Sequence, residues 1–331
     1  MSGWFSQLIL SRALSIVPLA FACTACGFML LGSFDSCCAE AAKKTRQVQF
    51  PKQSLGRLYE LKPGIDWIRV KSAYGQFFGT AANLVTVPQS ARLLLELDAN
   101  IGEQPRILES LDANALFSLR LRNLEPDAYL VPAISRLTGL HRLDVIDCTV
   151  TDKTVATLAH LNQLERLSLS SCGLNGDCMR DLVRLNKLKY LNISSNMLNS
   201  KSTSYISKIP TLVCLDVART RLTDDALLSL SKLTNLTFLN INSNPALTSK
   251  GFLALRSLKK LDSLYAQNTS IKASDIVALK GLPLKMMFLP KMQIRKAEMI
   301  ELHRIFPDCQ IIMQSSDAGP DYDVIFAPVS R

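Results

Sequence analysis

The sequence is poor in the residues that most often carry catalysis. Its 331 residues include only three histidines, His141, His160 and His303, which lie far apart along the chain. It has no H-E-x-x-H pair and no glycine-rich phosphate loop, and its one C-x-x-C pair, at residues 23–26, lies within a hydrophobic segment. These absences argue against metal-dependent, nucleotide-dependent and histidine-based chemistry. We therefore expect a protein that is not an enzyme and holds no metal or cofactor.

Aromatic residues are also scarce. They make up 7% of the chain, whereas hydrophobic residues as a whole make up 48%. Leucine and other aliphatic residues therefore supply most of the apolar mass, a composition typical of repeat proteins. Because 331 residues are many for one compact core, we expect an elongated fold whose core grows unit by unit.

Acidic residues are outnumbered by basic ones. The formal net charge is +10, which favours acidic partners or anionic surfaces without identifying one. Nucleic-acid binding would rest on this net charge alone. The charge-free segment at residues 13–32, which indicates export, and the mixture of charges of both signs disfavour it.

The N-terminal segment differs from the rest of the chain. Residues 13–32 contain no charged side chain, as expected of a targeting segment. Ala39 and Ala41 offer a small-x-small cleavage pattern, but twenty apolar residues also suffice to span a bilayer, and lipid attachment to a cysteine is a third alternative. We expect residues 1–41 to be a signal peptide or membrane anchor. The protein would then be exported or membrane-associated, in the cell envelope, the periplasm or the extracellular space.

A repeated pattern dominates the remainder. In LERLSLSSCGL, which begins at Leu164, leucines stand at positions one, four, six and eleven, and a cysteine stands at position nine. The same spacing begins again at residues 116, 140, 188, 212, 236, 261 and 284, with steps of 23 to 25 residues. Eight consecutive units in register indicate a solenoid.

Each unit reads as a short strand followed by a short helix. Leu167 and Leu169 are two residues apart and therefore face the same side of a strand. In the second half of the preceding unit, Val155 and Leu158 mark one buried stripe of a helix. Thr151 stands where that helix would begin and can cap it. Such a unit cannot bury its own apolar face, so neighbouring units must stack.

This pattern resembles the leucine-rich-repeat family over about residues 90–313. The second half of the unit, TDKTVATLAHL at residue 151 and TDDALLSLSKL at residue 223, is similar to the TDxxLxxLxxL repeats of bacterial secreted or membrane-associated members. The resemblance implies an α/β fold, a curved solenoid with a parallel inner sheet and short helices on its convex side. Because this fold exposes a large preformed sheet and the sequence offers no other site, we expect a non-catalytic module that binds other proteins.

The ends of the stack need closing against water. Residues 50–98 alternate apolar and polar side chains between glycines and prolines, which predicts a small β-rich cap. The full organisation that we expect is 1–41 signal peptide or anchor, 42–49 linker, 50–98 N-terminal cap, 99–296 repeats, 297–313 C-terminal cap and 314–331 tail.

Two cysteines occupy position nine of their units. Cys148 and Cys172 stand where later units have Asn196 and Asn244, a position that turns inward. We interpret both cysteines as small buried fillers. They would lie one strand spacing apart, about 5 Å, so a disulfide between them remains open.

The residues between the leucines of each strand form the predicted binding surface. Arginine and aromatic side chains, which are frequent at interface hot spots, recur there in two halves. We expect a protein or peptide ligand on the concave face of a monomer, although the charged residues could instead pair across strands and the aromatics pack together. The alternative function is an envelope scaffold held by its basic charge to anionic lipid or cell-wall polymer. The predicted partner-binding residues are Arg120, Arg122, Arg142, Asp144, Arg166, Tyr190, Phe238, Tyr265, Met286 and Phe288.

Overall fold

The computed structural model describes residues 44–314, apart from 63–74, 99–100, 102–104, 127–129, 291 and 293–294. The expected signal peptide or anchor lies outside the described residues, and so do residues 315–331 of the expected tail. Within the described chain no helix is both long enough and apolar enough to cross a membrane.

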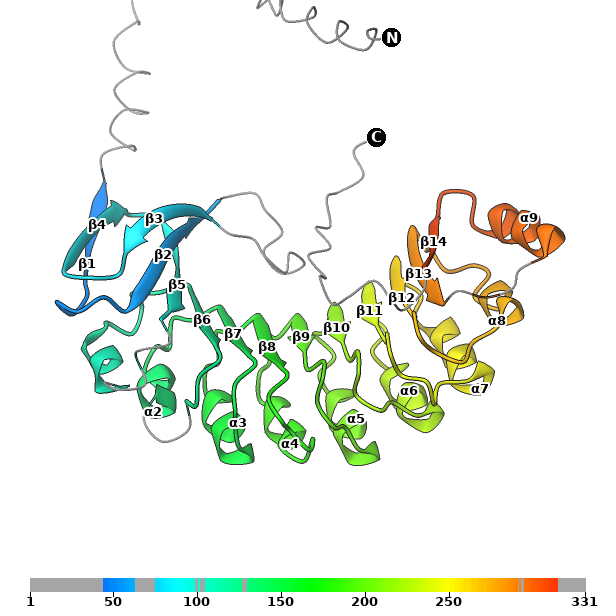
Figure 1. The fold of residues 1–331 in the computed structure, drawn as a ribbon, viewed down its shortest axis with the longest axis horizontal. Coiled ribbons are helices and arrows are strands. Elements are labelled where there is room, and N and C mark those ends of the chain that lie inside the picture. The colour runs from blue at the N-terminus through cyan, green and yellow to red at the C-terminus, as the bar shows by residue number, and fades with distance from the viewer. Residues whose placement is uncertain are drawn as a thin grey trace, which may run out of the picture. The chain divides into compact units, whose positions relative to one another are not determined.

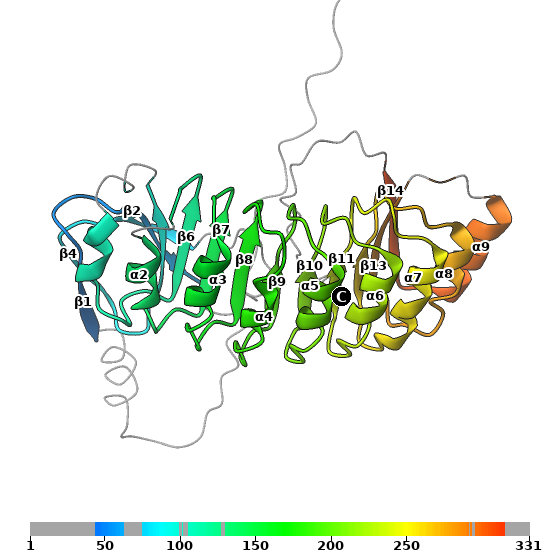
Figure 2. The same ribbon diagram turned by 90° about the horizontal axis from the view of Figure 1, so that it is seen from below.

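The repeats build one continuous sheet. Its strand order in the described chain is β14-β13-β12-β11-β10-β9-β8-β7-β6-β5-β2-β3. Neighbours from β5 to β14 pair in parallel, and β2 pairs antiparallel with β5 and β3. Short helices cover the outer side of this curved sheet, and no described helix covers the inner side (Figures 1 and 2). The predicted solenoid of strands and helices is therefore observed.

After the cap, strands and helices alternate along the described chain, except that η3 follows α7 directly. They are β1 (Thr45–Gln49), β2 (Gly56–Leu61), β3 (Gln76–Thr80), β4 (Leu84–Pro88), β5 (Arg92–Leu97), η2 (Pro105–Ser110), β6 (Ser118–Arg122), α2 (Leu130–Ser135), β7 (Arg142–Ile146), α3 (Asp152–Leu158), β8 (Arg166–Ser170), α4 (Met179–Leu182), β9 (Tyr190–Asn192), α5 (Ser200–Ile206), β10 (Cys214–Asp216), α6 (Asp224–Leu230), β11 (Phe238–Asn240), α7 (Ser249–Phe252), η3 (Leu253–Ser257), β12 (Ser263–Tyr265), α8 (Ala273–Val277), β13 (Met286–Pro290), α9 (Lys296–Ile305) and β14 (Gln310–Gln314).

The leucines of the repeat form the core between sheet and helices. Leu143, Leu167 and Leu191 are direct neighbours on successive strands, and each is fully buried. Residues one repeat apart in the sequence therefore lie next to each other on neighbouring strands, and the leucines of each unit pack against those of the unit before it. Replacing one such leucine by alanine costs about 2–5 kcal/mol.

The helices begin where the sequence predicted. Thr151 accepts a hydrogen bond from the backbone N–H of Thr154 through its side chain, and Thr223 accepts one from Ala226. Each bond satisfies an amide that would otherwise lack a partner in the first helical turn. The first turn of each of these two short helices is therefore stabilised by a side chain of the helix's own N-cap residue.

The side chain at position nine forms hydrogen bonds with the backbone of adjacent turns. Asn196 donates to the carbonyls of Leu169 and Ile193 at 2.7 and 2.9 Å, and its side-chain oxygen accepts from the amides of Cys172 and Leu174. The Cys172 thiol contacts the carbonyls of Val145 and Ser170 and is buried, which raises its pKa to about 12. Cys148 and Cys172 are free thiols, consistent with their prediction as fillers.

A left-handed residue follows shortly after each of the strands β6 to β12. Asp147, Ser171 and Arg219 have φ of 52°, 55° and 55°. Asparagine, aspartate and glycine tolerate this region, whereas a long side chain such as that of Arg219 is strained there. The chain therefore turns tightly out of the sheet at the same place in successive repeats.

The N-terminal cap differs from its predicted boundary. Residues 45–49, expected to belong to a linker, form β1, which pairs antiparallel with β4 from Thr45↔Pro88 to Gln49↔Leu84. The reason is that Val48 and Phe50 are buried at 3% and 1% exposure, so this short alternating segment has apolar surface to cover. At the other end, α9 buries Leu302, and β14 adds the last parallel strand.

Candidate interaction surface on the inner face of the sheet

Two rows of side chains run across the inner face of the parallel sheet. Each row joins residues that pair directly on neighbouring strands. The first row, at the third position of the unit, is Ser118, Arg142, Arg166, Tyr190, Cys214, Phe238, Ser263 and Met286. The second, at the fifth position, is Glu96, Arg120, Asp144, Ser168, Asn192, Asp216, Asn240, Tyr265 and Phe288. Both rows change from charged residues to aromatic residues towards the C-terminal end.

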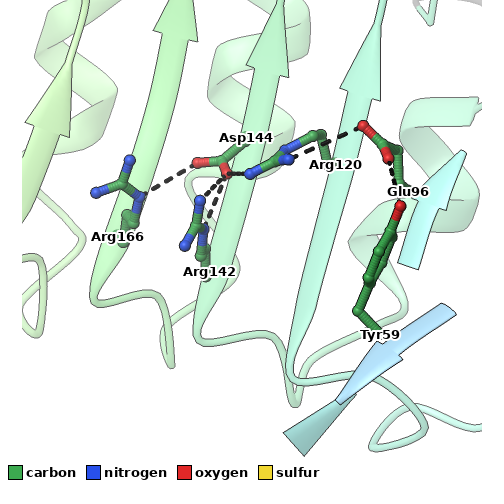
Figure 3. Close-up of polar contacts among 6 residues, drawn as sticks. All are labelled: Tyr59, Glu96, Arg120, Arg142, Asp144 and Arg166. Carbon is green, nitrogen blue, oxygen red and sulfur yellow. Dashed lines mark hydrogen bonds and ion pairs between the residues drawn. The ribbon is translucent and has the colours of Figure 1, made fainter. Parts of the chain in front are cut away.

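Asp144 is the centre of the charged half (Figure 3). Its carboxylate accepts from Nε of Arg142 at 2.9 Å, from Arg120 at 3.3 Å and from Arg166 at 3.3 Å. Arg120 also lies 3.9 Å from Glu96, which accepts from the hydroxyl of Tyr59 at 3.4 Å. Three guanidinium groups and two carboxylates thus meet on four adjacent strands.

The charges set one another's proton affinity. Burial by itself would raise the pKa of Asp144, but the nearby guanidinium groups of Arg142, Arg166 and Arg120 outweigh it and hold that pKa well below its ordinary value. Burial lowers the pKa of Arg142 to about 10, partly offset by Asp144. Asp144 and Arg142 are therefore ionised at neutral pH, and the Asp144 carboxylate offsets the mutual repulsion of the guanidinium groups that surround it.

Arg166 links the charged half to the aromatic half. Its guanidinium carbon lies 3.6 Å from the centre of the Tyr190 ring, a cation–π contact. Beyond it Phe238 and Tyr265 meet edge to face at 5.2 Å, and Tyr265 and Phe288 meet at 4.4 Å. Charged and aromatic residues therefore form one continuous layer of side chains on the inner face.

The degree of burial corrects one expectation. The predicted site residues were expected to face solvent, but Arg142 is fully buried, and Tyr190 and Tyr265 are only 2% and 4% exposed. Parallel strands lie only about 4.8 Å apart, so large side chains in one row pack against one another. The other predicted residues that are buried are Arg120, Asp144, Arg166 and Phe238.

Three of the predicted residues remain accessible. Arg122 is exposed at the end of β6, and Met286 and Phe288 are half-buried on β13. The structure also adds Glu96, Tyr59, Cys214 and Asp216 to the inner face, where Asp216 accepts from the side-chain amide of Asn240 at 3.1 Å. Glu96 and Tyr59 escaped sequence reasoning because they belong to the cap. Cys214 and Asp216 stand at the two positions that supply the rows and could have been found there.

The histidines do not meet one another. His160 and His303 contact backbone carbonyls of their own helices. His141, which directly precedes β7, lies 3.3 Å from the Glu165 carboxylate. In the described part of the chain, no group of three or more histidine, cysteine, aspartate or glutamate side chains is placed to hold a metal ion.

Three features define a leucine-rich-repeat solenoid: the stacked strand–turn–helix units, the leucine core, and the position-nine side chains that bond to the backbone of neighbouring turns. Its geometry is similar to an internalin (inlF) from Listeria monocytogenes, with 22% identity, a TM-score of 0.45 and 63% of each chain covered. It is also similar to internalin C2 of the same organism, with 19% identity and a TM-score of 0.49 over 66% of this chain and 93% of that one. A Leptospira interrogans LRR protein matches at 18% identity and a TM-score of 0.37, covering 60% of this chain and 62% of that one.

No family model matches the chain, and no curated protein matches it. The assignment to the leucine-rich-repeat fold therefore rests on the repeat geometry of this chain.

Proposed function

We propose that this protein is a non-catalytic interaction module that binds a protein or peptide ligand on the inner face of its sheet. The observation that carries the proposal is the segregation of that face into an arginine-rich half and an aromatic half. Both residue types are frequent at interface hot spots. Their mutual contacts hold them rigid, so little side-chain entropy remains to be lost on binding.

The accessible residues at the two ends of the face are the most direct contacts for a ligand. Arg122 offers a positive charge beside the buried guanidinium cluster, and Met286 and Phe288 offer apolar surface beside the aromatic cluster. The buried members would act by positioning these residues. A ligand that bridges both ends would need acidic and apolar side chains.

Affinity measurements on a partner captured with the full chain would test this proposal. Phe288→Ala combined with Arg122→Glu should weaken binding at least about tenfold, since each truncated hot spot costs about 1–2 kcal/mol or more. Leu228→Ala combined with Arg256→Glu changes the outer, helical side by the same chemistry and should leave affinity unchanged. Equal affinity of the two double variants would refute the choice of surface.

A second function is supported by the net charge of +10. In this alternative the protein is a scaffold held to anionic lipid or cell-wall polymer. Attachment would then fall steeply as salt is added and would survive Phe288→Ala. Export or membrane association follows only from residues 13–32, and sequencing the N-terminus of the mature protein would distinguish a cleaved signal from an anchor.

A further inference from the structure

A polar pocket lies on the flank of the solenoid, at the junction between the N-terminal cap and the first repeats. Its volume is about 510 Å³, within the range of small-ligand sites. It opens between β1, the start of β5 and the turns that precede β6, β7 and β8. Its polar lining includes Arg46, Arg92, Asn114, Thr138, His141 and Gln163.

The two arginines of the pocket are held in place. Arg46 donates through one Nη to the carbonyl oxygens of Ala91 and Ala115, at 3.3 and 3.4 Å. Arg92 lies over the ring of Phe117, with 5.0 Å between the guanidinium carbon and the ring centre. A cap residue thus reaches the first repeat, and both guanidinium groups have contacts within the protein that orient them.

An aromatic stack supports this arrangement. The rings of Phe117 and His141 are nearly parallel, with centres 4.6 Å apart and planes at 10°. His141 contacts Glu165 at 3.3 Å, and Glu165 accepts from Lys189 at 2.7 Å. Arg92, Phe117, His141, Glu165 and Lys189 therefore form one ladder along the flank.

The charged side chains that line the pocket are all basic. Its described lining contains two guanidinium groups and an imidazole but no carboxylate. The acid that contacts His141, Glu165, is matched by Lys189, so it does not balance the arginines. Fixed guanidinium groups bind the oxygens of phosphate and carboxylate groups in bidentate fashion.

We propose that this pocket binds a small polyanion that carries phosphate or carboxylate groups. Arg46 and Arg92 would hold the anionic oxygens, and the side chains of Asn114, Thr138 and Gln163 would donate further hydrogen bonds. The site is separate from the inner face and does not depend on the function proposed for that face.

Titration calorimetry on the full chain at low ionic strength would test the site, with pyrophosphate and citrate as the two probes. At least one probe should bind the wild-type protein, and Arg46→Gln with Arg92→Gln should weaken that binding at least about tenfold, the equivalent of one strong ionic contact. Preference for pyrophosphate would assign a phosphate ligand, and preference for citrate a carboxylate ligand.

A matched control separates the pocket from general charge. Arg180→Gln with Arg184→Gln removes the same charge from exposed positions at and beside α4 and should leave affinity within about twofold. Arg92→Gln alone, at an exposed position that leaves the Arg46 bonds intact, should still weaken binding. The proposal is overturned if neither probe binds, if Arg92→Gln binds as wild type does, or if the control weakens binding as much as the pocket variant.

Discussion

Removing the charge of Asp144 should destabilise the protein strongly. In Asp144→Asn three buried guanidinium groups lose the carboxylate that lies 2.5 to 3.3 Å from each of them. Breaking one buried ion pair by removing a partner costs about 3–5 kcal/mol. Because one carboxylate serves three arginines here, we expect a loss at or above the lower end of this range.

Urea unfolding followed by circular dichroism measures this loss. With an m-value of about 2–3 kcal/mol per molar, the midpoint should fall by about 1 M or more. Asp225→Asn is the matched control, because Asp225 is 83% exposed and pairs with Lys250 only at 3.8 Å. Its midpoint should stay within about 0.2 M of wild type. A shift as small as this in Asp144→Asn would contradict the interpretation of Asp144 as the centre of the cluster.

The same cluster predicts an acid dependence. The pKa of Asp144 is lower in the folded state than in the unfolded state, where it is about 3.9. Its contribution is therefore complete above about pH 4 and is lost as the pH falls towards the folded value. The stability gap between wild type and Asp144→Asn should shrink below about pH 4 in the same urea titrations.

Three further predictions concern the repeat itself. Asn196→Ala leaves buried amides and carbonyls of two adjacent turns without partners and should lower the free energy of unfolding by about 2–4 kcal/mol in urea titrations. An effect below about 0.5 kcal/mol would show that the Asn196 side chain does not hold these turns together. Arg219→Asn should raise stability by about 0.5–1 kcal/mol by relieving a left-handed residue, and a lower melting temperature would count against strain at that turn. The Cys172 thiol, with its pKa raised to about 12, should resist a disulfide reagent at neutral pH and react only in denaturant; rapid reaction of the native protein would show that it is not buried.

The repeat architecture could be predicted because it depends on local, periodic signals. The spacing of Leu167 and Leu169 determines which side of the strand faces the core, and Thr151 carries its capping oxygen in its own side chain. Both signals act within a few residues and recur in later units. Each signal alone is a weak preference for a strand or a helix, but its recurrence in stacked units makes the solenoid the only fold that satisfies all of them.

The features that were missed depend on partners distant in the sequence. The burial of Arg142 follows from neighbours on β6 and β8, and β1 forms because β4 offers it an edge. Asp147 and Ser171 carry no glycine signal for their left-handed turns, since the repeat imposes that conformation. Sequence reasoning therefore found the residues of the inner face but not how tightly they pack together.

Site-specific cross-linking tests the central claim most directly. A photoreactive amino acid would replace Phe288 on the inner face in one full-length variant and Leu228 on the outer helix α6 in another. With the captured partner present, we expect a covalent adduct from position 288 and none from position 228. An adduct from position 228 alone would contradict binding on the inner face of the sheet.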